Sequence, residues 1–222
     1  MQQGEPEILY EDNHLIAVNK PHGWLVHGDK TSDFTVGDWL KNYIKQKYNK
    51  PGDVFLGTVH RLDRPVGGVM IFARTSKSLE RMNKMFASKL VKKKYQAIID
   101  KIPQPEEQTL IHWLRKNPDT NKVDVSNIEK SKEYKLSETK YKLAGAYKKY
   151  FLVDLEPVTG RSHQLRAQMS YVGYPIIGDL KYGSNKKCVD GNIALKCISL
   201  CFEHPVKKEL LNIMLPEIVW NV

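Results

Sequence analysis

Short apolar runs separated by polar turns recur along most of the chain, a pattern that predicts strands rather than long helices. The first two runs, 8–10 and 15–19, flank the turn residues Asp12 and Asn13 and predict a β-hairpin. The Lys-Pro-His-Gly sequence at 20–23 then ends the second strand, because Pro and Gly interrupt regular structure. Further strands are expected at 54–59, 69–73, 92–99, 151–156 and 194–202.

Three segments carry apolar residues at helical spacing instead: 35–48, a segment that reaches Leu90, and 162–171. The candidate N-caps are Asp33 or Thr35 for the first helix and Ser76 or Ser78 for the second. The basic stretch 115–149 has weak periodicity and is expected to form exposed strands and loops. Because strands outnumber helices and follow one another along the chain, the expected class is α+β with a largely antiparallel sheet.

The composition is that of a globular protein. Hydrophobic residues make up 41% of the 222 residues and charged residues 27%, which excludes disordered and fibrous classes. No linker or repeat divides the chain, so we expect a single domain over 1–222. No apolar run approaches the roughly 20 residues of a membrane helix, and the first five residues lack the basic and apolar parts of a targeting signal. The expected location is therefore the cytoplasm.

The three cysteines, Cys188, Cys197 and Cys201, are too few and too unevenly spaced for a disulfide framework. Cys197, Cys201 and His204 have the faint spacing of a zinc site. Buried cysteines on a strand are the simpler interpretation, so no metal is expected.

Charge gives the first indication of a partner. Lys and Arg number 35 and Asp and Glu 25, for a net charge of +10, and the isoelectric point is near 9.3. Such a balance favours an anionic partner, most often a nucleic acid, although a solvated basic surface would show it too.

Asp63 stands between Arg61 and Arg64 in the segment 60–68, His-Arg-Leu-Asp-Arg-Pro-Val-Gly-Gly, which joins two predicted strands. Two flanking guanidinium groups favour the ionised carboxylate, which can act as a nucleophile or general base but not as a general acid. The two glycines allow the backbone to bend or to approach a ligand closely. A structural ion-pair cluster would use the same residues, so this segment alone leaves both interpretations open.

Two further segments carry basic and aromatic side chains. In 159–166, Thr-Gly-Arg-Ser-His-Gln-Leu-Arg, polar residues begin a helix whose N-terminus can attract a phosphate or simply be capped. Arg161 and Arg166 are five residues apart, so one can meet the aspartate while the other meets a backbone phosphate. Lys94 and Tyr95 begin a strand, where the ring can stack on a base or remain half-buried.

Together these segments resemble the RluA-type family of pseudouridine synthases. The family's His-Arg-Leu-Asp-Arg signature stands at 60–64, Lys-Pro-x-Gly at 20–23, Lys-x-Tyr at 93–95 and Gly-Arg-x-His-Gln-Leu-Arg at 160–166. Gly-x-Pro-Ile-x-Gly-Asp and Tyr-Gly match 173–179 and 182–183, and a late strand with His-Pro matches 194–205. The resemblance runs from about Ile8 to Pro216, and this order of several motifs is far more specific than any one of them.

Two positions depart from the family pattern. Val66-Gly67-Gly68 stand where Thr-Ser-Gly is more frequent, and Gln168 stands where the family often has a histidine. These departures concern local support or RNA contacts and leave the catalytic residues intact. Many relatives also carry an N-terminal RNA-binding domain, and because the resemblance begins close to residue 1, we expect a catalytic domain without it.

The resemblance implies a largely antiparallel bent sheet flanked by helices, with a central RNA-binding cleft. It implies that Asp63 is the catalytic aspartate, which either attacks the sugar C1′ or removes a proton from the sugar. Arg166 would pair with Asp63, Tyr95 would stack on the uracil or assist proton transfer, and Arg61 would either fill the space of a flipped base or form a salt bridge. Further RNA contacts are expected from Lys20, His60, Arg64, Lys94, Arg161, His163 and Gln164.

The implied reaction isomerises uridine to pseudouridine without redox change or loss of a group, so no cofactor or metal is expected. The expected partner is a tRNA or rRNA stem-loop whose target base leaves its stack, and the protein is expected to act as a monomer. The alternative is a non-catalytic RNA-binding or RNA-folding protein on the same scaffold. The presence of intact Asp63, Tyr95 and Arg166 argues against this alternative. A DNA-binding domain would need a recognition motif that the chain lacks, and a glycosidase would need a second catalytic carboxylate.

Overall fold

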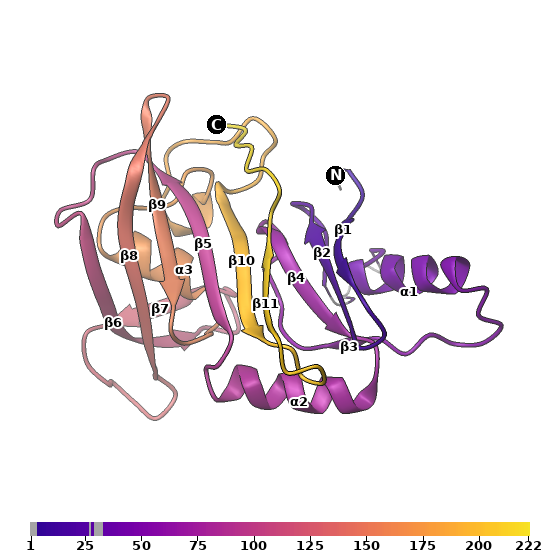
Figure 1. Ribbon diagram of the computed structural model, residues 1–222. Helices are drawn as coiled ribbons and strands as arrows, with labels where there is room; N and C mark the ends of the chain where they lie inside the picture. The colour runs from indigo at the N-terminus through magenta and orange to yellow at the C-terminus, as the bar shows by residue number, and fades with distance from the viewer. Residues whose placement is uncertain (1–3, 27, 29–32) are drawn as a thin grey trace. The chain divides into compact units, whose positions relative to one another are not determined.

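The computed structural model describes residues 4–26, 28 and 33–222 (Figure 1). Residues 1–3, which belong to the N-terminal segment considered above for a targeting signal, lie outside the described residues. The chain divides into two compact units, Met1–Lys92 with Cys197–Ile218 and Lys93–Lys196 with Val219–Val222. The single domain over 1–222 stays a prediction. Along the described part of the chain, no helix is both long and apolar enough to cross a membrane.

The sheet of the first unit follows the order β1-β2-β4-β10, with β11 paired to β10 and β3 to β4. β1 and β2 form the predicted hairpin. The strand predicted over 54–59 is confirmed only at two residues, because it meets β4 only at Phe72 and Ala73. The strands of this sheet are β1 (Glu7–Glu11), β2 (Leu15–Lys20), β3 (Gly57–Thr58), β4 (Gly67–Ala73), β10 (Leu195–Glu203) and β11 (Leu210–Met214).

Helix α1 (Val36–Lys47) confirms the first predicted helix and one of its two candidate caps. Thr35 Oγ1 accepts the N–H of Asp38 at 3.1 Å, and Asp38 Oδ2 accepts the N–H of Thr35 at 3.1 Å. This reciprocal capping box satisfies two backbone donors that the first turn leaves unpaired. Asp33, the other candidate, is not the cap.

Helix α2 (Ser76–Ala87) differs from its prediction at both ends. Thr75 is the N-cap, and its Oγ1 accepts the N–H of Ser78 at 3.1 Å, so neither predicted serine caps the helix. The helix stops before Leu90 because Lys89 adopts a left-handed conformation with φ 58°. Leu90 is 63% exposed instead of completing the apolar face.

The core of the first unit is built on β2 and β4. All residues of β4 are buried, and the side chains of Ile16 and Ile71 are completely inaccessible. Gly68 has φ +112°, and a Cβ there would lie 2.1 Å from the carbonyl oxygen of Cys197. Only glycine allows β4 to approach β10 this closely.

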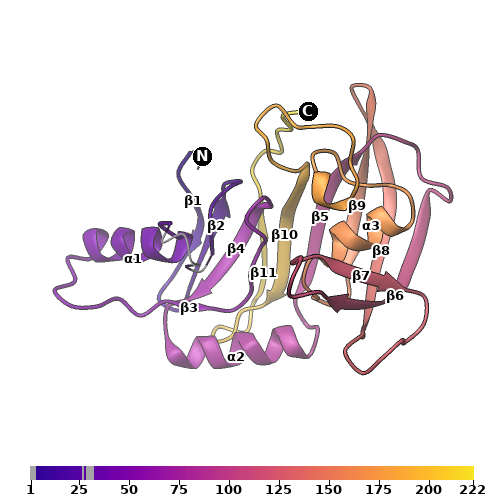
Figure 2. The ribbon, with the colours of Figure 1, turned by 180° about the vertical axis from the view of Figure 1, so that it is seen from behind.

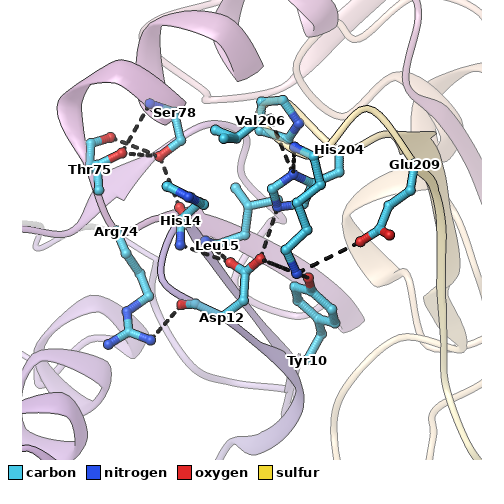
Figure 3. A network of polar contacts seen from close by, with 12 residues as sticks. Tyr10, Asp12, His14, Leu15, Arg74, Thr75, Ser78, His204, Val206 and Glu209 are labelled. Carbon is cyan, nitrogen blue, oxygen red and sulfur yellow. Dashed lines mark hydrogen bonds and ion pairs between the residues drawn. The ribbon is translucent and has the colours of Figure 1, made fainter.

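Asp12, in the turn between β1 and β2, is the centre of a polar network (Figure 3). Its Oδ1 accepts the N–H groups of His14 and Leu15 at 2.8 Å each. Lys207 Nζ and His204 Nε2, from the turn between β10 and β11, each lie 3.0 Å from its Oδ2. Burial would raise the pKa of Asp12, but the hydrogen bonds from His14, Leu15 and Lys207 outweigh it and hold this pKa well below its ordinary value.

His204 is fully buried, and its Nδ1 accepts the N–H groups of Val206 at 3.1 Å and Lys207 at 2.8 Å. An Nδ1 that accepts hydrogen bonds carries no proton, so the ring is neutral. Burial lowers the pKa of His204 below its ordinary 6.5. Ser78 of α2 donates to the carbonyl of His14 at 2.9 Å, so the network ties the two turns and a helix together (Figure 3).

Replacing Asp12 with asparagine is expected to lower the free energy of unfolding by about 2 kcal/mol at pH 7, because several buried donors lose a charged acceptor. The folded pKa of Asp12 is lowered, so its contribution is present above the unfolded pKa and is lost as the pH falls. The difference between wild type and Asp12→Asn should therefore shrink between pH 5 and pH 3 in urea unfolding. Glu80→Gln, which removes an exposed partner of Lys84, is the control; a difference independent of pH would contradict the prediction.

The sheet of the second unit follows the order β5-β9-β8-β6-β7, with antiparallel neighbours throughout. β5 coincides with the predicted strand 92–99, and β8 and β9 form a long hairpin (Figure 1). The stretch 115–149 forms strands joined by loops, as predicted, but it is not exposed throughout, because Val123, Ser137, Thr139 and Tyr141 are buried. The strands are β5 (Lys92–Ile99), β6 (Glu107–Lys116), β7 (Val123–Ser126), β8 (Lys135–Tyr147) and β9 (Tyr150–Pro157).

Helix α3 (Gln164–Tyr171) packs against β6, β7 and β9, on one face of this sheet (Figure 2). The short 3-10 helix η1 (Leu180–Tyr182) contacts α3. The other strands predicted at 69–73, 151–156 and 194–202 are β4, β9 and β10. The expected α+β class with a largely antiparallel sheet is confirmed.

Candidate functional site

Asp63 lies in the connection between β3 and β4, a segment anchored at both sides of the carboxylate. Leu62 and Val66 are buried, with exposed fractions of 6% and 3%. The backbone turns between them, where the carbonyl of Asp63 accepts the N–H of Val66 at 2.9 Å. Arg61 and Arg64 are exposed, and the Asp63 side chain is partly buried. The alternation of apolar and charged residues thus buries the loop's anchors and leaves its charged groups accessible.

His60 attaches this loop to the core rather than pointing into solvent. Its Nε2 accepts the N–H of Ile71 at 3.0 Å, and its ring stacks on Phe86 of α2 with centroids 5.0 Å apart. Because Nε2 accepts a backbone hydrogen bond, it carries no proton. Within the first unit, this role in holding the loop accounts for His60, while its expected RNA contact stays a prediction.

The turn 20–24 braces the Asp63 loop from the side of β2. Lys20 Nζ donates to the carbonyls of Pro21 at 3.1 Å, Trp24 at 2.9 Å and Arg64 at 3.2 Å. The N–H of Gly23 also donates to the carbonyl of Arg64, at 2.9 Å. The backbone next to the aspartate is therefore held by two donors from the Lys-Pro-x-Gly sequence.

Lys20 is completely buried, which contradicts its expected contact with RNA. Its ammonium group donates to three backbone carbonyls instead of facing solvent. Burial lowers the pKa of Lys20 to about 7, although the negative charge of Asp63 acts in the opposite direction. Lys20 therefore stabilises the backbone of the Asp63 loop from inside the protein.

The two arginines that flank Asp63 differ in their surroundings. Arg64 Nη2 forms an ion pair with Asp33 at 2.9 Å, and its Nε donates to the carbonyl of Gly23 at 3.2 Å. Arg61 is exposed, and the described residues offer it no hydrogen bond or ion pair. The salt bridge considered as its alternative role is therefore absent among the described residues, and its guanidinium group faces solvent.

In the second unit, Gln164 fixes the loop that leads into α3. Its Oε1 accepts the Thr159 hydroxyl at 2.7 Å and the N–H of Arg161 at 2.9 Å. Its Nε2 donates to the carbonyl of Glu138 and the hydroxyl of Thr139, each at 2.9 Å. Gln164 is only 4% exposed. The structure therefore contradicts its expected RNA contact, since every polar atom of the amide already bonds to the protein.

Two residues of this loop remain accessible. Arg161 is exposed and makes one long bond, from Nε to the carbonyl of Leu136 at 3.4 Å. His163 adopts a left-handed conformation with φ 49°, and its Nδ1 lies 2.8 Å from the hydroxyl of Tyr182. Both stay candidates for RNA contacts.

On β5, Lys94 is 42% exposed and forms an ion pair with Asp154 at 2.8 Å. Tyr95 is partly buried and lies opposite Leu155 of β9. Because neighbouring residues of a strand point to opposite faces, the tyrosine shares a face with buried Ala97. This places the ring at the border between the core and the exposed end of the strand.

Arg166 is buried inside the second unit, with 6% of its side chain exposed. Its Nε and Nη2 donate to Oδ2 and Oδ1 of Asp179 at 2.7 and 2.9 Å, a bidentate ion pair. Sequence reasoning missed Asp179, although it belongs to the Gly-Asp of 178–179 that contributed to the family resemblance. The pairing of Arg166 with Asp63 stays a prediction.

Gln168, one of the departures from the family pattern, is completely buried and fully bonded. Its Oε1 accepts the Thr139 hydroxyl at 2.7 Å, and its Nε2 lies 3.2 Å from Nδ1 of His112 and 3.3 Å from the carbonyl of Leu110. Burial lowers the pKa of His112, consistent with a neutral ring that accepts this bond. Glutamine thus provides local support for α3 at this position.

Each unit groups part of the predicted site. The first unit gathers Lys20, His60, Asp63 and Arg64 around one loop, and the second gathers Arg161, His163, Gln164 and Arg166 at the start of α3. In the described residues, no group of three or more His, Cys, Asp and Glu side chains could hold a metal ion.

The family model for RNA pseudouridylate synthase matches residues 14–171, well over half of the chain. A human protein titled RNA pseudouridylate synthase domain containing 4 has a similar structure, with a TM-score of 0.79 and 26% identity over 96% of this chain and 88% of that one. A second human protein, RNA pseudouridylate synthase domain containing 1, is similar in fold with a TM-score of 0.75, over 98% of this chain and 86% of that one, at 24% identity.

Bacterial relatives carry related names. The ribosomal large subunit pseudouridine synthase C of Buchnera aphidicola is 33% identical over 94% of this chain and 66% of its own length. A tRNA pseudouridine synthase C from Pectobacterium carotovorum is 32% identical over 93% of this chain and 58% of its own. The chain thus spans slightly less than two thirds of the curated relatives it matches. Sequence, fold and site motifs agree, and the chain belongs to the RNA pseudouridylate synthase family.

Proposed function

We propose that this protein is an RNA pseudouridine synthase and that Asp63 is its catalytic residue. The observation that carries the proposal is the Asp63 loop: its carboxylate is partly buried, its backbone is gripped by Lys20 and Gly23, and its neighbour Arg61 faces solvent. A structural ion-pair cluster would instead hold both Arg61 and Arg64 in ion pairs. Family membership supports the reaction type.

The proposed reaction breaks the N1–C1′ bond of uridine, turns the uracil, and forms a C5–C1′ bond. The proton on C5 leaves, and N1 gains a proton, so atoms and electrons balance without a redox partner. Asp63 serves either as the nucleophile at C1′ or as the base that removes a sugar proton. Both roles require an ionised carboxylate in a fixed position, and the bonds that hold the backbone next to Asp63 support the fixed position.

Roles for the second unit rest on the resemblance of its motifs. Arg166 is proposed to pair with the catalytic carboxylate, and Tyr95 to stack on the uracil or assist the final proton transfer. The exposed Arg61 is proposed to occupy the space of the flipped base, since its guanidinium can stack where the base has left. The substrate is proposed to be a tRNA or rRNA stem-loop, because relatives are named for each.

Tritium release from RNA labelled at uracil C5 tests the proposal. Wild-type protein is expected to release label from total tRNA or from rRNA transcripts in a time-dependent way, and the responding pool identifies the target class. If no pool releases label while RNA still binds with high affinity, the catalytic proposal fails and the non-catalytic RNA-binding alternative takes its place.

RNA binding is expected to weaken steeply with salt because Arg and Lys contacts displace counterions from phosphates. If Arg161 contacts one phosphate, Arg161→Gln should make the slope of log K against log salt less negative by about 0.7 to 0.9. Filter binding from 50 to 300 mM KCl measures the slope. Lys84→Gln, on the exposed face of α2 and already paired with Glu80, is the control; an unchanged slope for Arg161→Gln would remove that residue from the interface.

A further inference from the structure

Asp179 is the one carboxylate in the second unit that is almost completely buried, with 1% of its side chain exposed. It lies before η1, where its backbone carbonyl accepts the N–H groups of Tyr182 at 3.0 Å and Ser184 at 3.1 Å. Its side chain grips Nε and Nη2 of Arg166 at 2.7 and 2.9 Å. The backbone of this turn therefore fixes the carboxylate, and the carboxylate fixes the arginine.

The ring of Tyr182 makes a second contact with the same guanidinium group. The Arg166 Cζ lies 5.1 Å from the ring centroid, within the range of a cation–π contact. The ring itself is held, because its hydroxyl accepts the N–H of Val123 on β7 at 2.9 Å and lies 2.8 Å from Nδ1 of His163. Ser170 of α3 donates to the Tyr182 carbonyl, which ties the turn to the helix.

A buried ion pair of this kind is weak evidence for stability, since desolvation of both charges offsets their attraction. Its geometry is the more informative property. A bidentate pair fixes both the position and the plane of a guanidinium group, and a ring against its face removes the remaining freedom to tilt. The exposed pair between Arg115 and Asp124, at 2.9 Å in the same unit, has no such burial.

We propose that Asp179 is a positioning residue for the reaction, which fixes the guanidinium of Arg166, and that Tyr182 completes this clamp. The inference rests on the proposed function, because it gives Arg166 a catalytic role. Asp179 acts only through Arg166 and contacts neither substrate nor reacting atoms. A purely structural pair would support α3 without changing the rate of isomerisation in folded protein.

Asp179→Asn keeps the shape of the side chain and removes its charge. Its single-turnover rate of tritium release is expected to fall about 100-fold, the size of effect caused by a misplaced catalytic group, while the Kd for RNA changes less than twofold. Added to Arg166→Lys, the Asp179→Asn change should cause little further loss of rate, because both substitutions disable the same ion pair. Asp124→Asn, the matched control, should keep the wild-type rate.

Thermal unfolding checks that each variant is folded. If Asp179→Asn does not fold, Asp179→Glu and Tyr182→Phe replace it: the first keeps the charge but displaces it by one methylene, and the second keeps the ring but loses its bonds to Val123 and His163. Each is expected to reduce the rate with unchanged Kd. A folded variant at this position with the wild-type rate, or losses that multiply with Arg166→Lys, would overturn the proposal.

The nitrogen-15 NMR signal of the Arg166 Nε–H separates this proposal from the proposed function. In wild type the Nε–H resonance should be shifted downfield and its proton should exchange slowly with water, as expected for a short bond to a carboxylate. Asp179→Asn should abolish both properties. If wild type releases no tritium from any RNA but shows this signal, the reaction fails while the clamp stands. If the signal is that of a solvated arginine, the clamp fails whatever the activity.

Discussion

Asp63→Asn is expected to reduce the release of tritium from C5-labelled RNA by at least about 1,000-fold, at the upper part of the range attributed to a positioned acid–base group. Asparagine has the same size and can accept hydrogen bonds, but it is neither a nucleophile nor a base at neutral pH. The loop should keep its conformation, because its anchors are the buried Leu62 and Val66 and the bonds to the carbonyl of Arg64.

The variant is best compared with Asp53→Asn, which changes an exposed aspartate shortly before β3 in the same unit. That control should keep wild-type activity and RNA affinity. The Kd of Asp63→Asn for RNA should stay within a fewfold of wild type, because a single carboxylate contributes only a weak repulsion of the RNA phosphates. Substantial residual isomerisation by a folded Asp63→Asn protein would move the catalytic role to another residue.

Lys20→Met is expected to lower both the stability of the protein and the rate of the reaction. Methionine fills a similar volume but leaves the carbonyls of Pro21, Trp24 and Arg64 without their common donor. Buried acceptors without partners cost about 1–3 kcal/mol, partly offset because a buried ammonium group is no longer desolvated. The net loss in the free energy of unfolding should be about 2 kcal/mol at pH 7.

The activity of Lys20→Met should fall further than its stability suggests. The bond from Lys20 to the Arg64 carbonyl is one of two that hold the backbone next to Asp63. Losing it should lower the single-turnover rate about 10- to 100-fold with little change in Kd, because misplacement of the carboxylate affects the transition state more than RNA binding. Wild-type rate in a folded Lys20→Met protein would contradict the bracing role.

The pH dependence gives Lys20 a distinct signature. Its folded pKa of about 7 lies below the ordinary 10.5 of a lysine, so between these values the unfolded state binds more protons than the folded state. The free energy of unfolding of wild type should therefore rise with pH across this window, relative to Lys20→Met. Urea unfolding at pH 7 and pH 9.5 measures the difference; Lys41→Met, an exposed lysine of α1, should follow wild type at both.

Local sequence determined much of the secondary structure. The β1–β2 hairpin, α1 with its Thr35 cap, and β5 occur where their patterns predicted, because an Asp-Asn turn, a capping box and an apolar run each act within a few residues. The ends of α2 were not predicted: Thr75 caps the helix instead of Ser76 or Ser78, and Lys89 terminates it. Three hydroxyl residues within four positions, at 75, 76 and 78, make this boundary ambiguous in sequence.

The sequence by itself also determined the family and the position of the candidate catalytic loop, since both rest on ordered motifs that are read without coordinates. Tertiary structure alone decided which polar residues are accessible. Lys20 and Gln164 resemble RNA contacts in sequence, yet both are buried and bonded to the protein. Lys20 meets the carbonyl of Arg64, 44 residues away, and Arg166 meets Asp179 across a helix end and a turn. Burial depends on segments brought together only in the folded chain, so no local pattern distinguishes a lysine or arginine held inside from one that faces RNA.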